Sequence, residues 1–264
     1  MRTFLAAAMA ASLALLPACA PAVSEAAAEK PTIVLVHGAF ADASSWNGVI
    51  AELQDDGYPV VAAANPLRGV ASDALTIASI VRSIDGPVLL VGHSYGGPVI
   101  TEAAVGQGNV RGLVYVAGFA PETGESSLSL SALYPGSTLG EALSPVVLPG
   151  GGQDLYITPA RFHQQFAADV SADEAALMAA TQRPVLLAAL EEPSGEASWK
   201  VLPSYMIYGS EDRNIPPAVM RFMAERAQAR STLVLDGASH ALMVSHPQDV
   251  ASFIEAAAID SMRQ

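Results

Sequence analysis

Cysteine is almost absent from this sequence of 264 residues, because Cys19 is the only one. A single cysteine cannot form a disulfide within the chain, which excludes the class of small exported domains that disulfides hold together. Histidine is scarce as well, and the five histidines occur in neither a HExxH nor a HxxEH pattern. The sequence therefore predicts no metal site. No GKS or GKT follows the three glycines at 150–152, so they indicate a turn, and we expect no cofactor.

Basic residues are also few, with 13 Lys and Arg against 26 Asp and Glu and a net charge of −13. Nucleic-acid binding depends largely on Lys and Arg side chains that neutralise phosphates, so we exclude nucleic acid as a partner. The hydrophobic fraction of 51% and the charged fraction of 15% are typical of a globular protein with an ordinary core.

Long apolar runs are confined to the N-terminus, where residues 4–16 follow Arg2 and precede a stretch of small residues. This pattern is typical of a secretory signal. We expect residues 1–28 to be a signal peptide, the protein to be exported to the periplasm or the medium, and no integral membrane span to follow. LPAC resembles a bacterial lipobox, so cleavage before Cys19 with a lipid anchor is the alternative.

From residue 31 onward, short β-branched runs alternate with longer amphipathic stretches, which predicts a single α/β domain over 29–264. The expected architecture is a doubly wound, mainly parallel six-stranded sheet. The runs are continuously apolar, which indicates strands covered on both faces. The six expected strands are 32–38, 58–64, 87–93, 110–118, 204–209 and 231–237. The expected helices are 44–55, 72–84, 96–105, 217–228 and 247–259.

This alternation stops between about residues 121 and 199. The segment combines Ser, Gly and Pro-rich passages with Ala-rich pieces and is too long for a plain loop. We interpret it as an inserted, mostly helical cap that lies over the sheet.

Ser94 stands in GHSYG, where a buried strand turns sharply into a helix. Gly92 and Gly96 lack side chains that would collide in so tight a bend, so the pattern predicts a nucleophile elbow. A serine nucleophile needs a base and a residue that orients the base. His240 and Asp212 each follow a later predicted strand, and we predict these roles for them, with the neighbouring Glu211 as the rival of Asp212.

The oxyanion that forms on attack needs two backbone N–H donors. We predict those of Phe40 and Tyr95 for the oxyanion hole, with Ala39 as the alternative to Phe40. His37 is interpreted as a structural residue that shapes this loop, and His93 as one that packs against the elbow.

Taken together, VLVHGAF, VGHSYGG, YGSEDRNIP and DGASHALMVSHP resemble the α/β-hydrolase superfamily from residue 32 to the C-terminus. The likeness is to the branch that contains plant hydroxynitrile lyases, plant methyl-ester esterases and bacterial pyrethroid hydrolases. Lyases of this branch tend to carry Thr where Gly38 stands and Lys where Ala241 stands. The resemblance therefore implies ester hydrolysis rather than cyanide release.

The predicted activity is hydrolysis of small to medium apolar carboxylic esters through an acyl-enzyme on Ser94. Two alternatives use the same fold: a cofactor-free perhydrolase or haloperoxidase, and a ligand-binding receptor. The expected partner is a small-molecule ester, and the sequence leaves the oligomeric state open. The cap residues expected to line the substrate pocket are Tyr134, Tyr156, Phe162, Phe166, Met178 and Trp199.

Overall fold

Six strands form one sheet in the order β2-β1-β3-β4-β8-β9, and all five neighbouring pairs are parallel. The computed structural model describes residue 3 and residues 29–263, so the predicted signal peptide and Cys19 lie outside the described residues. The sheet confirms the predicted α/β architecture. Its strands are Thr32–Val36 (β1), Val60–Ala63 (β2), Val88–His93 (β3), Val110–Val116 (β4), Ser204–Gly209 (β8) and Ser231–Leu235 (β9).

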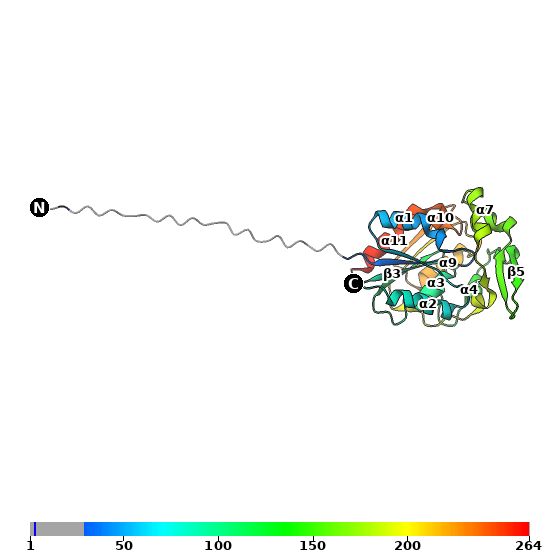
Figure 1. Ribbon diagram of the computed structural model, residues 1–264, viewed down its shortest axis with the longest axis horizontal. Coiled ribbons are helices and arrows are strands. Elements are labelled where there is room, and N and C mark those ends of the chain that lie inside the picture. Colours follow the sequence, from blue (N-terminus) through cyan, green and yellow to red (C-terminus); the bar gives the residue numbers. More distant parts are fainter. Residues whose placement is uncertain (1–2, 4–28, 264) are drawn as a thin grey trace.

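Helices cover both faces of this sheet (Figure 1), which explains why every residue of β3 is buried. α1 and α11 lie on one face, and α2 and α3 lie on the other, where α3 contacts β3 directly. Prolines begin α9 and α11, at the position where a missing N–H is tolerated. The bounds are Ala43–Trp46 (η1, a 3-10 helix), Asn47–Asp55 (α1), Val70–Arg82 (α2), Gly96–Ala103 (α3), Pro217–Arg226 (α9), Leu242–Ser245 (α10) and Pro247–Ser261 (α11).

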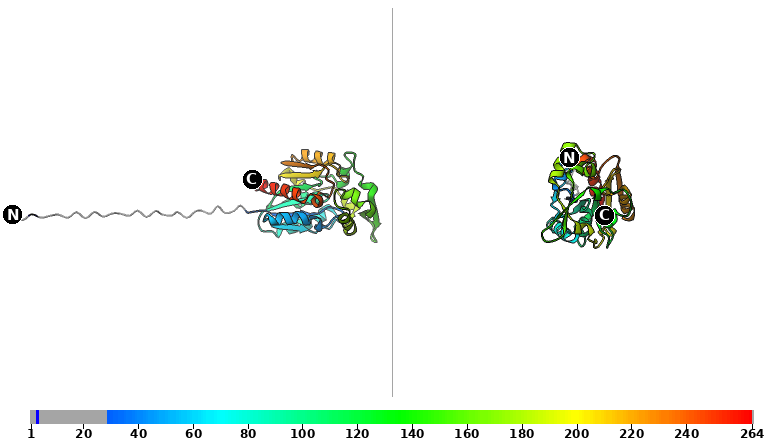
Figure 2. Two further views of the ribbon diagram at one scale, coloured as in Figure 1. Left: turned by 90° about the horizontal axis from the view of Figure 1, so that it is seen from above. Right: turned by 90° about the vertical axis from the view of Figure 1, so that its right-hand side faces the viewer.

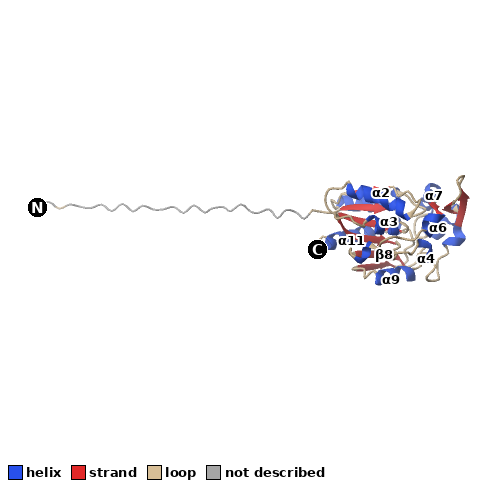
Figure 3. Cartoon of the chain, turned by 90° about the horizontal axis from the view of Figure 1, so that it is seen from below, coloured by secondary structure: helices blue, strands red, loops and turns tan. Residues whose placement is uncertain are grey.

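The insertion between β4 and β8 lies at the end of the sheet opposite the chain's C-terminus (Figures 2 and 3). It receives the chain directly from the carboxyl end of β4, so it covers the edge where the loops after the strands meet. Most of its regular structure is helical. The helices are Ser127–Ser131 (α4), Leu139–Ala142 (α5), Pro159–Phe166 (α6), Ala172–Thr181 (α7), Leu187–Glu191 (α8) and Ser198–Lys200 (η2, a 3-10 helix).

The cap also contains a small antiparallel sheet that the sequence pattern did not predict. Its strands are Leu143–Val147 (β5), Gln153–Ile157 (β6) and Val185–Leu186 (β7). β5 contains a proline and is mostly exposed, so it lacks the continuous apolar run of a buried strand. The glycines at 150–152 form the turn between β5 and β6, where Gly151 and Gly152 have φ of 87° and 82°. Glycine adopts this left-handed conformation without strain.

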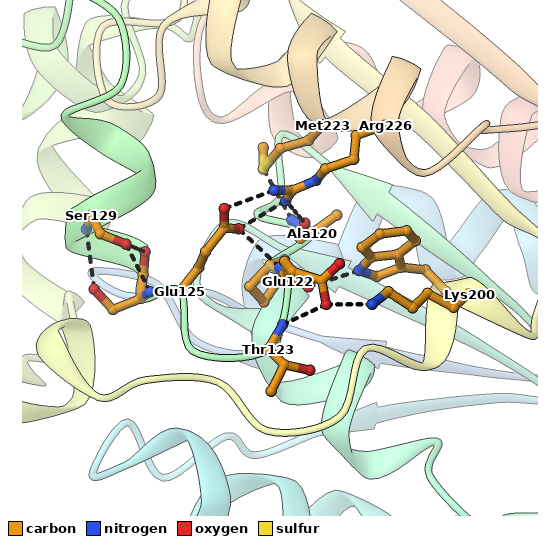
Figure 4. A network of polar contacts seen from close by, with 11 residues as sticks. Ala120, Glu122, Thr123, Glu125, Ser129, Lys200, Met223 and Arg226 are labelled. Carbon is orange, nitrogen blue, oxygen red and sulfur yellow. Dashed lines mark hydrogen bonds and ion pairs between the residues drawn. The ribbon is translucent and has the colours of Figure 1, made fainter.

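Two stems connect the cap to the sheet, and backbone hydrogen bonds join them. Gly124 N–H donates to Ser194 O at 2.8 Å, and Ser194 N–H donates to Glu125 O at 2.7 Å. Arg226 of α9 contacts the first stem (Figure 4), donating to both carboxylate oxygens of Glu125 at 2.7 and 2.9 Å. Its guanidinium also donates to Ala120 O at 2.8 Å. Arg226 thus links the base of the cap to α9 through three hydrogen bonds.

Among residues 29–263, no helix combines the length and the apolar composition that crossing a membrane requires.

Two ion pairs at the cap base should differ in their contribution to stability. Arg226 and Glu125 form a partly buried ion pair with two hydrogen bonds. We therefore expect a double-mutant cycle with Arg226→Ala and Glu125→Ala to give a coupling free energy of about 1–3 kcal/mol. Lys200 and Glu122 form a more exposed ion pair with one hydrogen bond and serve as the matched control. For this pair we expect a coupling free energy of about 0–1 kcal/mol. Urea unfolding of each variant measures both values, and equal couplings would contradict this account.

Candidate active site

Ser94 lies in the turn that joins β3 to α3, with φ of 52°. This left-handed conformation is costly for a residue with a side chain, and it is the strained geometry that a nucleophile elbow requires. The elbow is possible because Gly92 and Gly96 pack closely against backbone atoms of other residues. A Cβ on Gly92 would lie 2.5 Å from Gly96 O, and one on Gly96 would lie 2.4 Å from Val36 O. Distances this short exclude any side chain, so the two glycines let the turn pack against β1.

His240 and Asp212 form a buried pair beside the elbow. His240 Nδ1 lies 2.6 Å from Asp212 Oδ2, and because a carboxylate accepts, the Nδ1–H donates. The other oxygen of Asp212 accepts the N–H groups of Asn214 and Ile215 at 2.8 and 2.9 Å. The carboxylate is therefore fixed by its own loop. Glu211, the rival candidate, is exposed and makes no side-chain hydrogen bond to a described residue.

Ring contacts place His240 next to the turn that carries Ser94. The His240 and His93 ring centroids are 4.7 Å apart, and His93 Nε2 lies 3.1 Å from His240 O. The His240 ring also packs against the Phe166 ring in a T-shaped arrangement, with the centroids 5.1 Å apart. The Ser94 hydroxyl itself makes no hydrogen bond to a described residue, and it borders a cavity. With Nδ1–H committed to Asp212, the Nε2 of a neutral His240 ring is the nitrogen left to accept a proton.

The predicted oxyanion donors need one correction. Phe40 N–H donates to Arg183 O at 3.0 Å, so this donor is already engaged by the cap. Ala39 N–H and Tyr95 N–H have no hydrogen-bond partner among the described residues, and both residues border the cavity beside Ser94. The structure thus favours Ala39, the alternative, over Phe40. Sequence reasoning missed this because the partner of Phe40 lies more than 140 residues away.

The Tyr95 side chain is hydrogen-bonded to a buried carboxylate, that of Asp73, which the sequence analysis did not identify as a functional residue. Its hydroxyl donates to Asp73 Oδ2 at 2.9 Å. Asp73 also accepts the N–H of Arg68, at 3.1 Å to Oδ2. Burial raises the pKa of Asp73, although these hydrogen bonds act in the opposite direction, and burial together with the nearby Asp73 charge raises the pKa of Tyr95 far above its ordinary value. Asp73 thereby fixes the residue that follows the nucleophile.

The cavity beside Ser94 has a volume of about 140 Å³. Its cap wall is aliphatic rather than aromatic, and Phe40, Tyr95 and Phe119 complete it from the sheet domain. We name it the Ser94 chamber. Its leucines are Leu128, Leu139, Leu143, Leu155, Leu187 and Leu190.

None of the six cap residues expected in the substrate pocket borders this chamber. Phe162 and Phe166 are fully buried and stack on each other at 5.0 Å. Tyr134 packs against Phe222, and Trp199 Nε1–H donates to Pro121 O.

Tyr156 lies on β6 opposite Ser144, and Met178 borders a second cavity that Phe40 also borders. The sequence analysis did not predict this leucine-lined wall, because cap leucines that line a cavity have the same sequence pattern as leucines that pack in the core.

The histidines near the elbow are neutral parts of the framework. His37 Nδ1–H donates to Gly38 O at 2.9 Å, and its Nε2 accepts from Asn65 N–H at 3.0 Å. Burial lowers the pKa of His37, and it lowers the pKa of His93 well below its ordinary value, with His240 adding to the shift. His37 is therefore placed as the loop-shaping residue that the sequence indicated. Within the described residues, no cluster of His, Cys, Asp and Glu has the arrangement of a metal site.

The comparisons with known proteins agree with the α/β fold described above. A sequence model of the alpha/beta hydrolase family matches residues 33–253. The carbendazim hydrolyzing esterase of Nocardioides sp. (strain SG-4G) is 34% identical over 110 residues, which are 37% of this chain and 46% of that esterase. The match thus spans less than half of that relative's length.

Two solved structures share the fold. Polyneuridine aldehyde esterase superposes with a TM-score of 0.76 at 19% identity, over 87% of this chain and 100% of the other. A pyrethroid hydrolase from Sphingobium faniae JZ-2 gives 0.68 at 22%, over 87% and 97%. At these identities the likeness shows the fold alone.

The neutral His93 makes stability depend on pH. In the unfolded chain His93 takes up a proton near pH 6.5, whereas in the folded protein its pKa lies well below that value. The unfolded state then binds more protons, so the free energy of unfolding falls as the pH drops through 6.5. Between pH 7.5 and 5.5 we expect His93→Gln to reduce this loss by about 1.4 kcal/mol, measured by urea unfolding. An unchanged pH dependence in the variant would show that His93 has the same pKa in the folded and unfolded states and would contradict this account.

Proposed function

We propose that this chain, which belongs to the alpha/beta hydrolase family, is a serine esterase in which Ser94, His240 and Asp212 form the catalytic triad. The observation that carries the proposal is the buried 2.6 Å contact between His240 and Asp212 beside a strained serine turn. Such a pair orients a base toward a nucleophile. The relatives support the reaction class, because their names include a carbendazim hydrolyzing esterase and a polyneuridine aldehyde esterase.

The first half of the reaction forms an acyl-enzyme. His240 Nε2 takes the proton from Ser94 Oγ while Oγ bonds to the ester carbonyl carbon. The carbonyl oxygen becomes an anion and accepts hydrogen bonds from the N–H groups of Ala39 and Tyr95. The carbon–oxygen bond to the alcohol then breaks, and the alcohol leaves with the proton that His240 held. The acyl group remains on Ser94.

The second half returns the enzyme to its starting state. A water molecule gives a proton to His240 and attacks the acyl carbon, and the same two N–H groups hold the second oxyanion. The bond to Ser94 Oγ breaks, the carboxylic acid leaves, and Oγ recovers its proton from His240. Asp212 stabilises the charged His240 ring in both halves, which is the role its fixed position suits.

The Ser94 chamber supports a small apolar acyl group. Six leucines border a cavity of about 140 Å³, and no Lys or Arg side chain is among its lining residues. A chamber of this kind favours short aliphatic chains over charged ones, because a buried charge without a partner is costly. The proposed substrates are therefore esters of small to medium apolar carboxylic acids.

Lyase chemistry is not supported. Ala241 follows His240 and has no cation with which to hold a departing cyanide. A Cβ on Gly38 would lie 2.6 Å from Ser94 Cβ, so the position has no room for a larger side chain.

Ester hydrolysis by triad variants tests this proposal. We expect Ser94→Ala to lower kcat for p-nitrophenyl butanoate by about 10⁴-fold or more, and Asp212→Asn by about 10⁴-fold, because the nucleophile or the orientation of the base is lost. The matched control is Ser204→Ala, another buried serine, which lies at the start of β8 and should keep its activity.

A fluorophosphonate probe should label the unaltered protein and fail to label Ser94→Ala. If Ser94→Ala retained full activity, the triad would be wrong. Labelling without turnover of any ester would instead favour the receptor, and acyl transfer to hydrogen peroxide faster than to water would favour the perhydrolase.

A further inference from the structure

Asp73 is a fully buried carboxylate to which the proposed reaction steps give no role. It stands in the first turn of α2, a helix that packs against α3. The Tyr95 hydroxyl donates to its Oδ2 at 2.9 Å, and the N–H of Arg68 donates to the same oxygen at 3.1 Å. Leaving a buried carboxylate without donors is costly, so each of these bonds resists displacement. Asp73 is therefore a fixed point beside the helix that follows the nucleophile.

Contacts with the cap fix the chain just before Asp73. Arg68 donates through its guanidinium to Asp154 Oδ1 at 2.6 Å, and the N–H of Val70 donates to Glu192 Oε2 at 2.6 Å. Both acceptors belong to the cap, on β6 and directly after α8. Because the N–H of Arg68 also bonds to the Asp73 carboxylate, the cap, this loop and Asp73 form one connected set of hydrogen bonds.

Tyr95 extends this connection to the site, because it directly follows Ser94 and its N–H is one of the two proposed oxyanion donors. Its side chain is buried, with 1% of the residue exposed, and its hydroxyl is committed to Asp73. The N–H and the Cβ of Tyr95 are attached to one Cα. A rotation that displaced the N–H would therefore also displace the ring and pull the hydroxyl away from Asp73.

The peptide group between Ser94 and Tyr95 needs to be held, because Ser94 has a strained φ of 52°. Strained backbone persists only where the surrounding structure fixes it. Ser94 O accepts the N–H groups of Gly97 at 3.0 Å and Phe119 at 3.2 Å, which holds the carbonyl end of this peptide. The N–H of Tyr95 has no partner among the described residues, so the contact with Asp73 secures this end through the side chain.

We propose that Asp73 is a positioning residue for the oxyanion hole, an inference that rests on the proposed esterase function. Through the Tyr95 hydroxyl it holds the Tyr95 N–H where the oxyanion forms. Donors of an oxyanion hole act over a narrow range of about 2.7–3.1 Å from the oxyanion, so a small displacement weakens them. Their bonds strengthen only when the carbonyl oxygen becomes an anion. Loss of the Asp73 contact should therefore lower kcat and leave KM nearly unchanged.

Tyr95→Phe tests this role, because it removes the hydroxyl and keeps the ring. We expect kcat for p-nitrophenyl butanoate, counted per site labelled by the fluorophosphonate probe, to fall about tenfold while KM changes less than about twofold. The matched control is Tyr115→Phe. Tyr115 is also buried and its hydroxyl is hydrogen-bonded to Thr101 Oγ1 at 2.8 Å, but it lies within β4 and does not border the Ser94 chamber. Equal losses of kcat in the two variants would overturn the positioning role.

A double-mutant cycle tests whether Asp73 and Tyr95 act together. Asp73→Ala removes the acceptor and should lower kcat per labelled site at least as much as Tyr95→Phe does. In the double variant, Tyr95→Phe should then cause almost no further loss, because the contact is already absent. Losses that multiply would show two independent effects and overturn the proposal. If Asp73→Ala fails to fold, Tyr95→Phe still decides the question through the inhibitor below.

Propyl trifluoromethyl ketone reports on the oxyanion hole directly. Ser94 Oγ bonds to its carbonyl carbon, the Oγ proton passes to His240, and the carbonyl oxygen becomes an oxyanion that resembles the transition state. We expect its inhibition constant to rise about tenfold in Tyr95→Phe, in proportion to the loss of kcat/KM, and to stay unchanged in Tyr115→Phe. An unchanged constant in Tyr95→Phe would overturn the role of Asp73 alone. If the unaltered protein neither hydrolysed the ester nor was labelled at Ser94, the esterase function would be overturned with it.

Discussion

Close contact between backbone segments at the carboxyl edge of the sheet is the constraint on which the site depends. A Cβ on Gly97 would lie 2.1 Å from Phe119 O, and the glycines of the Ser94 turn meet β1 and their own helix just as closely. Only residues without side chains allow β3 to turn into α3 within this space. The turn sets the strained φ of Ser94 and brings His93 against His240. The residue before the proposed nucleophile therefore contacts the proposed base because the backbone is so tightly packed.

Polar contacts between the cap and the sheet domain shape the same site from above. Arg183 O engages Phe40 N–H, so a cap carbonyl helps decide which N–H groups remain open beside Ser94. Glu192 of the cap accepts from Val70 N–H at the start of α2, and Arg68 in the preceding loop donates to cap Asp154 at 2.6 Å. The cap is therefore part of the site's framework. A change in its position would alter the loop that holds Phe40.

Local apolar runs and glycine spacing were enough to predict the six strands, the flanking helices and the roles of Ser94, Asp212 and His240. The stretch GHSYG indicates a tight turn wherever it follows a buried strand. The fold was needed to show that Ala39 rather than Phe40 has an N–H without a partner among the described residues, that Asp73 holds Tyr95, and that cap leucines rather than aromatics border the cavity beside Ser94. Each of these contacts joins residues far apart in the chain. Their partners are set by how the cap folds over the sheet, which no local pattern of residues encodes.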